Sequence, residues 1–263
     1  MSLDSLLATC DRLQESIRKL DPIHHELWPT IQKKLRIDWT YHSNAIEGST
    51  LSRGETQFFL EEGLTVEGKP FKDFVDAKNH AEAIDFLFDI VKQNRSITES
   101  FIKELNALLM SGLAFTPAID ASGNPTQKPA HPGAYKRHPN HVLQLDGTIH
   151  RYVDPLQVQP EMEALCAYIS TSKDHVIHVA AMAHYHLVRI HPFDDGNGRV
   201  ARILMNLILL RTGYSPAVIR VETRRQYLTA LSQADQGDIE GFVSFVASAV
   251  RETQESFISD LER

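Results

Sequence analysis

The chain has 263 residues, of which 42% are hydrophobic and 23% are charged, enough apolar material for one large globular domain. Its formal net charge of −7 argues against a general nucleic-acid binder, because proteins of that class are normally basic. With only two cysteines, we expect no disulfide framework and a reducing, cytoplasmic compartment. The first residues lack a basic leader and no apolar run is long enough to span a bilayer, so we expect no membrane segment.

Apolar residues recur at helical spacing through most of the first 110 residues. This periodicity predicts five helices, over about 3–20, 24–43, 51–60, 71–93 and 96–110. Ser52 followed by Glu55 is typical of a capping box at the start of the third helix, and Ser96 followed by Glu99 predicts the same at the fifth.

The character of the sequence changes between residues 111 and 155, where glycine and proline recur and helical spacing disappears. Partial alternation around Asp146 and Gly147 predicts a small β-hairpin over 141–152. Helical patterns then resume, at about 155–172, 174–190, 197–212, 223–235 and 238–260. The chain is therefore predicted to form one all-α domain with one hairpin.

One short segment between two predicted helices concentrates the residues of a phosphate site. Pro192 discourages continuation of the first helix, and the glycines that follow permit a tight turn into the second, whose N-terminus favours anions. Arg199 and Arg202 are three residues apart and project from one side of that helix, which suits a di- or triphosphate. Asp195 offers one hard oxygen ligand for Mg²⁺, and His191 can accept a proton near neutral pH.

The ordered string at 191–202, H-P-F-D-D-G-N-G-R-V-A-R, resembles the signature of the Fic (Fic/Doc) family, H-P-F-x-D/E-G-N-G-R-x-x-R. Every specified position is filled, and the likeness extends over roughly residues 30–250. The resemblance implies a Fic-type helical domain over 31–263 with a hairpin flap, preceded by an N-terminal helical extension over 1–30. It also implies a protein adenylyltransferase, which transfers AMP from ATP, with Mg²⁺, to a serine, threonine or tyrosine hydroxyl of a target protein.

The resemblance assigns a role to each motif residue. His191 would deprotonate the target hydroxyl, Asp195 would hold Mg²⁺, and Phe193 would anchor the loop in the core. Tyr227 would approach the adenine, although an aromatic residue at helical spacing is as often part of a core. The phosphates would be bound by Gly196, Asn197, Gly198, Arg199 and Arg202.

A second segment, 43–48, ends the helix predicted before it. Because a carboxylate at a helix C-terminus is unfavourable to the helix dipole, Glu47 is expected to have a specific cationic partner. The segment also resembles the S/T-x-x-x-E-G/N motif of the inhibitory helix in Fic proteins, which would place that helix near 33–48. By this resemblance Glu47 would pair with Arg202 and occupy the place of the γ-phosphate, while Ser43 would help to fix the helix.

Several alternatives stay open at this point. The 141–152 hairpin would align the target segment by main-chain pairing, or would be only decorative. The same site could remove AMP by hydrolysis, use another nucleotide donor, or serve as a nucleotide-binding regulatory module. The histidines crowded between 175 and 191 invite a metallohydrolase interpretation, but no glutamate follows at the spacing of a zinc protease. Homodimerisation is left open, and neither nucleic acid nor membrane is expected as a partner.

Overall fold

The computed structural model describes residues 2–20, 25–93, 95–119, 123–140, 142–143 and 149–262. Helices dominate these residues, and their bounds are α1 Leu3–Leu20, η1 His25–Leu27, α2 Trp28–Ile46, α3 Arg53–Glu62, α4 Phe71–Gln93, α5 Glu99–Leu109, α6 Pro155–Thr171, α7 Val176–Ile190, α8 Asn197–Arg211, η2 Val221–Thr223, α9 Arg224–Asp235 and α10 Ile239–Leu261. The prediction of a mostly helical fold is confirmed.

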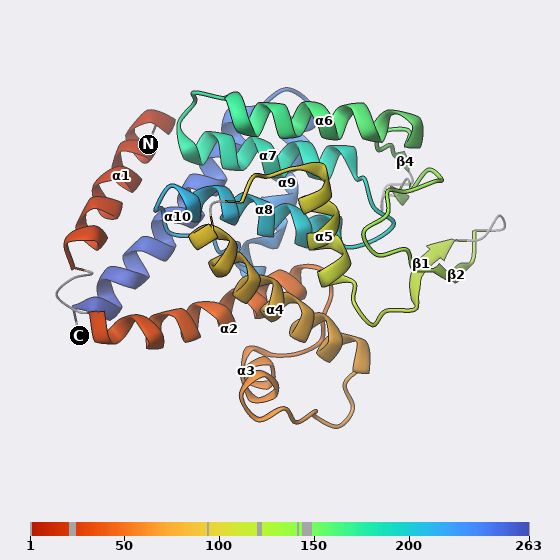
Figure 1. The fold of residues 1–263 in the computed structure, drawn as a ribbon, viewed down its shortest axis with the longest axis horizontal. Helices are drawn as coiled ribbons and strands as arrows, with labels where there is room; N and C mark the ends of the chain where they lie inside the picture. Colours follow the sequence, from red (N-terminus) through yellow and green to blue (C-terminus); the bar gives the residue numbers. More distant parts are fainter. Residues whose placement is uncertain are drawn as a thin grey trace.

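Helix α8 is the centre of the molecule, with α7 beside it and α2, α4, α5 and α10 around the pair (Figure 1). Nearly every residue of α8 from Asn197 to Leu209 is buried, because its apolar side chains cover all sides of the helix. The first turns of α8 also carry two charged residues, Arg199 and Arg202, into the same interior. The fold thus places two guanidinium groups inside the core.

The first helix packs along the last one. Helix α1 lies against α10, where the Cys10 thiol donates to the Ala247 carbonyl and the Gln254 side chain donates to the Cys10 carbonyl. Leu6 and Cys10 belong to the main core. The boundary predicted at residue 30 stays a prediction, but α1 packs as part of the main body.

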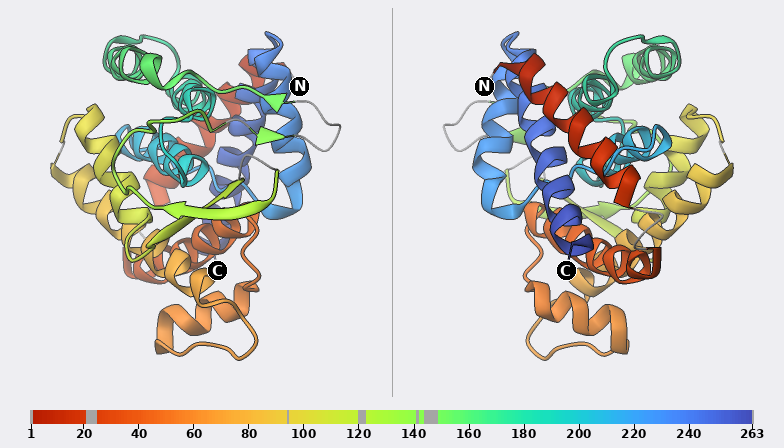
Figure 2. Two further views of the ribbon diagram at one scale, coloured as in Figure 1. Left: turned by 90° about the vertical axis from the view of Figure 1, so that its right-hand side faces the viewer. Right: turned by 90° about the vertical axis from the view of Figure 1, so that its left-hand side faces the viewer.

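One of the two predicted helix caps is present, and the other helix is capped by a different residue. Ser52 and Glu55 form the predicted capping box at α3. At α5 the cap is Thr98 rather than Ser96, because the Thr98 hydroxyl accepts from the Phe101 backbone N–H. Helix α3 and its flanking loops project from the body in all three views (Figures 1 and 2).

Two antiparallel hairpins lie together on the side that faces the viewer in the left panel of Figure 2. The predicted hairpin is present as β3 Val142–Leu143 and β4 Ile149–His150, with Val142 opposite His150; its turn at 144–148 lies outside the described residues. A second hairpin, β1 Phe115–Ile119 with β2 Pro125–Pro129, was not predicted. Prolines in both strands hide the alternation that marks a strand, since proline removes a ladder donor.

Within the described ranges, no helix combines the length and apolar character that a bilayer crossing requires.

Candidate active site

The loop that joins α7 to α8 is held by its own side chains. Helix α7 ends at Ile190, and His191 follows in the left-handed conformation, with φ 51° and ψ 58°. The Asn197 side chain accepts from the Phe193 N–H and donates to the Phe193 carbonyl, both at 2.9 Å. Phe193 is 1% exposed and anchors the loop in the core, as predicted. The Asn197 side-chain amide therefore closes the loop. The phosphate contact predicted for Asn197 would have to come from its backbone N–H.

Left-handed Gly196, at φ 79°, leads into the first turn of α8. Backbone N–H groups in the first turn of a helix have no acceptor within the helix and carry the positive end of its dipole. The backbone at 196–198 thus has the geometry of an anion cradle. Its glycines are closely packed, since a β-carbon on Gly198 would overlap the Glu47 carboxylate.

Arg199 is a buried cation with a short carboxylate partner. Its side chain is 3% exposed, and Nη1 donates to Oδ1 of Asp76 on α4 at 2.6 Å. Oδ1 of Asp195 lies farther away, 3.8 Å from Nη2. Asp76 carries no recognisable motif, so sequence reasoning did not find it. Asp76 orients the Arg199 guanidinium group, whose Nη2 also meets the Met110 sulfur at 3.4 Å.

Arg202 lies one turn further along α8 and is 2% exposed. It makes three hydrogen bonds to α2 and its C-cap: Nε donates to the Ser43 hydroxyl and Nη2 to the Ser43 carbonyl, both at 2.9 Å, and Nη2 donates to Oε1 of Glu47 at 2.7 Å. The predicted Glu47–Arg202 pair is confirmed. Ser43 holds the arginine itself, which is more than the helix-fixing role expected of it.

Glu47 is the C-cap of α2, and its side chain remains 44% exposed although it is hydrogen-bonded to the buried Arg202. Burial acts to raise the pKa of its carboxyl group, but the charge and hydrogen bond of Arg202, with smaller contributions from Arg199 and His191, outweigh burial and lower it. Glu47 is therefore an anion at neutral pH, and the Arg202 fork is occupied by a carboxylate.

His191 lies at the edge of this cluster. The Tyr152 ring stacks on its imidazole, with ring centroids 3.8 Å apart and an interplanar angle of 20°. Burial, and next the charge of Lys136, lower the pKa of His191 from 6.5 to about 3. The imidazole is thus neutral at physiological pH, which is the form that accepts a proton.

A neutral base, an anion cradle and two oriented guanidinium groups lie together at the N-terminus of α8. The Fic/DOC family model matches residues 96–209, the stretch that contains this loop. A protein adenylyltransferase Fic of Nematostella vectensis is 34% identical over 227 residues, which is 83% of this chain and 48% of that protein. This chain belongs to the Fic/DOC family.

Other relatives agree with that assignment. The protein adenylyltransferase fic-1 of Caenorhabditis elegans is 33% identical over 80% of this chain and 38% of its own length. Among solved structures, a Fic domain containing signaling protein from Bacteroides thetaiotaomicron superposes with a TM-score of 0.85 at 29% identity, covering 97% of each chain. Fic-1 of Caenorhabditis elegans gives 0.76 at 27% identity, covering 97% of this chain and 73% of that one. The chain spans about half or less of the length of these curated relatives.

Two further residues predicted for the Fic site are Tyr227 and Asp195. Tyr227 is 2% exposed; its hydroxyl lies 3.0 Å from Nε2 of the buried His184, and its side chain also interacts with Arg202. Tyr227 is thus a buried neighbour of Arg202, and its contact with the adenine stays a prediction. Asp195 is partly exposed, and its carboxylate accepts from the Gly196 N–H at 2.6 Å. A single carboxylate beside a phosphate cradle fits Mg²⁺, because that ion usually takes one or two carboxylates and completes its shell with phosphates and water.

The crowded histidines do not form a metal centre within the part of the chain that the structure describes, where no group of three or more potential ligands is found. His175 instead caps α7 and contacts Asp11, and His184 is packed in the core. The Fic loop is therefore the site that the described residues build.

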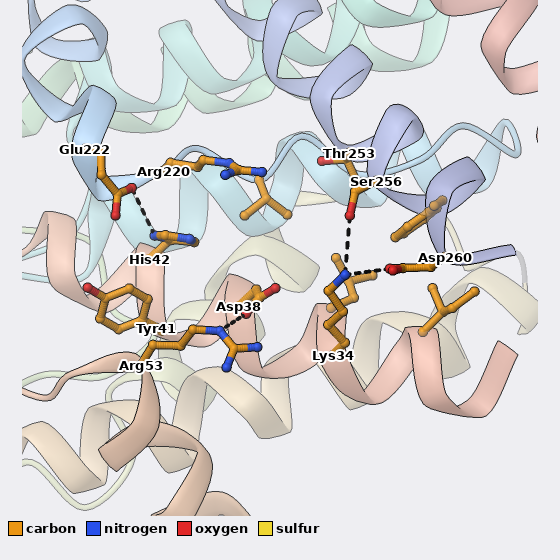
Figure 3. A pocket seen from close by; sticks show the side chains of 14 residues that line it. Lys34, Asp38, Tyr41, His42, Arg53, Arg220, Glu222, Thr253, Ser256 and Asp260 are labelled. Atoms are coloured by element: carbon orange, nitrogen blue, oxygen red, sulfur yellow. Dashed lines mark hydrogen bonds and ion pairs between the residues drawn. The ribbon is translucent and has the colours of Figure 1, made fainter. Parts of the chain in front are cut away.

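A separate cavity of about 370 Å³ lies on a different face of α2, between that helix, η2 and α10 (Figure 3). Two ion pairs line it, Lys34 with Asp260 at 2.6 Å and Arg53 with Asp38 at 2.5 Å, and the His42 ring lies 3.8 Å from the Glu222 carboxylate. Helical spacing gives α2 two different faces. Ser43 and Glu47 point toward Arg202, whereas Asp38 and His42 point toward the cavity. The cavity is not the phosphate site.

Proposed function

We propose that this chain transfers AMP from ATP to a serine, threonine or tyrosine hydroxyl of a protein, and that Glu47 inhibits the transfer. The observation that carries the proposal is the pair of buried guanidinium groups at the N-terminus of α8, close to the His191 imidazole on which Tyr152 stacks. Catalysis of phosphoryl-type transfer is mainly positioning and charge stabilisation, which these groups can provide. The names of the adenylyltransferase relatives support the same reaction.

In the proposed reaction the target oxygen attacks the α-phosphorus of ATP. The bond to the β,γ-pyrophosphate breaks, pyrophosphate leaves, and the hydroxyl proton passes to the His191 imidazole. The backbone at 196–198 and Arg199 would hold the phosphates, and Arg202 would hold the γ-phosphate. Asp195 would hold Mg²⁺, which neutralises phosphate charge when bound.

The inhibitory role of Glu47 follows from competition for one guanidinium group. Arg202 presents a planar fork that matches a carboxylate or a phosphate, but not both at once. With Glu47 at 2.7 Å, the γ-phosphate would have to displace it. We expect low transfer by the wild-type chain for this reason.

We further propose that the target segment pairs along the β3–β4 hairpin, which lies next to Tyr152 and hence to His191. Main-chain pairing at an exposed strand edge places few demands on side chains. The two cysteines of the described chain are free thiols, which supports a cytoplasmic location.

The test uses ATP labelled on its α-phosphate, incubated with Mg²⁺, cell lysate and one of four proteins: wild type, Glu47→Gly, Glu47→Gly with His191→Ala, and Glu47→Gly with Asp195→Asn. Protein-bound label only with Glu47→Gly alone would support the reaction, the brake, the base and the metal ligand together. No label in any sample would contradict the proposal. A second assay on an AMP-modified target distinguishes AMP removal, since that activity would depend on the presence of Glu47.

A further inference from the structure

The segment that precedes the β3–β4 hairpin lies against the catalytic loop and donates to its backbone. Tyr135 forms a β-bridge with Phe193, and the Lys136 N–H donates to the Pro192 carbonyl at 2.8 Å. The Asn140 side-chain amide donates to the Phe193 carbonyl at 2.9 Å and to the His191 carbonyl at 3.3 Å. The loop carbonyls around the base are thus held from outside the motif.

The Lys136 side chain is 3% exposed, which is rare for a lysine. Its Nζ donates to Oδ1 of Asn140 at 2.8 Å and to the carbonyl of Ile190, the last residue of α7, at 3.3 Å. Burial lowers the pKa of Lys136 to about 8, and the more distant charges of Asp154 and Asp194 oppose this. Burial of an ammonium group that is held mainly by neutral oxygens costs free energy. We therefore look for a role of this group in its position next to His191.

His191 needs such support because of its backbone. Among the described residues it is the one non-glycine residue with positive φ, a conformation that costs on the order of 1–2 kcal/mol for a residue with a side chain. The hydrogen bonds from Lys136 and Asn140 reach the carbonyls at 190, 191 and 193, on both sides of this residue. They oppose its relaxation to an ordinary conformation.

Groups from several parts of the chain act on the protonation of the His191 imidazole. Lys136 and His150 disfavour its protonation, Glu47 favours it, and the Val188 backbone also favours it. Tyr152 covers one face of the ring. Lys136 contributes most to keeping the ring neutral after burial itself.

We propose that Lys136 and Asn140 are positioning residues for the base: Asn140 fixes the left-handed backbone of His191, and the bond from Lys136 to the Ile190 carbonyl holds a buried ammonium group next to this loop. The inference rests on the proposed role of His191 as the base. A purely structural clamp would stabilise the loop without affecting the protonation of the ring, so the two roles are separable.

The first test needs no turnover. The imidazole resonances are titrated by NMR over roughly pH 2 to 8, a range that includes the low midpoint expected of His191, and the His191 signal is identified by its loss in His191→Ala. In Lys136→Met we expect the His191 midpoint to rise by about one pH unit or more, because a nearby positive charge is removed. Arg137→Met removes an exposed cation from the next position and is the matched control, in which we expect no change. An unchanged midpoint in Lys136→Met would overturn the electrostatic role.

The second test uses AMP transfer in the Glu47→Gly background. Asn140→Ala keeps the ammonium group but removes the amide, so we expect kcat to fall roughly tenfold or more, with the KM for ATP almost unchanged. Thermal unfolding of each variant confirms that it is folded. An unaltered kcat in folded Asn140→Ala would refute the positioning role. If the Glu47→Gly parent itself transfers no AMP, the proposed function fails, whereas the NMR titration still decides the effect of Lys136 on His191.

Discussion

Gly198 packs directly against the carboxylate of Glu47, so closely that a β-carbon at position 198 would overlap Oε1 and also approach Nη1 of Arg202 at 3.2 Å. The motif glycine therefore gives the Glu47 carboxylate the space it needs beside Arg202. A side chain at position 198 and Glu47 cannot both keep their places.

This contact predicts that Gly198→Ala raises AMP transfer above that of wild type, because the new methyl group displaces Glu47. In the Glu47→Gly background the same substitution should not raise AMP transfer further. Any decrease in transfer there would measure a direct effect of the methyl group on phosphate binding. Labelled-ATP assays on the four proteins of this double-mutant cycle measure the coupling. Gly54→Ala is the control, since a β-carbon there meets nothing within 4 Å. Equal transfer by wild type and Gly198→Ala would contradict the prediction.

Ser43 supplies two of the hydrogen bonds to Arg202. We predict that Ser43→Ala, in the Glu47→Gly background, weakens ATP binding by about tenfold, because a hydrogen bond to a charged group contributes roughly 1.5 kcal/mol. Titration calorimetry measures the dissociation constant. Ser248→Ala removes a hydroxyl that bonds within α10 and should leave the constant unchanged. Identical affinities for both serine variants would mean that Ser43 does not orient the arginine.

Asp76 is the short carboxylate partner of the buried Arg199. We expect Asp76→Asn to lower the free energy of unfolding by about 3 kcal/mol, because it removes the short counter-charge of a buried guanidinium group and leaves only Asp195 at 3.8 Å. Urea unfolding gives the value. Asp85→Asn removes the partner of Arg36 in a largely exposed pair and should cost less than about 1 kcal/mol. Similar losses in the two variants would argue that the Asp76–Arg199 pair is not special.

Two core histidines predict how stability depends on pH. Burial, and then the charge of Arg202, lower the pKa of His184 to about 3, and burial also holds the pKa of His80 well below its usual value. Below pH 6.5 the unfolded chain therefore binds protons that the folded chain does not, so stability present above pH 6.5 should fall as the pH drops toward 5. Each group contributes at most about 1.4 kcal/mol per pH unit.

Urea unfolding at several pH values between roughly 7.5 and 5 measures this slope. In His184→Gln the slope should be shallower than in wild type, because one of the histidines with a lowered pKa, among which His191 also counts, no longer titrates. Parallel pH profiles for the two proteins would exclude His184 as a source of the pH dependence.

The sequence predicted those parts of the site that lie in one continuous stretch or in a short motif. The loop from His191 to Arg202 was predicted because its residue types and spacing carry that chemistry. For Glu47 the residues predicted only a cationic partner, and the resemblance to the Fic family implied that this partner is Arg202. Asp76, Lys136 and Asn140 were missed as members of the site. Their types are common, and only the tertiary fold brings them to the loop, so spacing gives no signal for them.

The same limit applies to the fold. Helices such as α4 and α8 were predicted almost to the residue, because their apolar spacing is regular and their ends carry turn residues. The β1–β2 hairpin was missed because its prolines suppress the strand pattern. The β1–β2 hairpin is also held by a tertiary contact that the sequence does not reveal: Lys128 pairs with Asp194 of the loop between α7 and α8 at 2.5 Å.

The division of the Arg202 hydrogen bonds between two partners has a consequence for the speed of activation. Ser43 would keep the guanidinium group aimed after the carboxylate leaves, so the arginine needs no reorganisation before it meets a phosphate. Glu47 has a partly exposed side chain with room to turn outward. Under the proposed inhibition, rotation of that one side chain would free Arg202 with α2 left in place. Such rotations take nanoseconds or less at exposed positions, far faster than the movement of a helix.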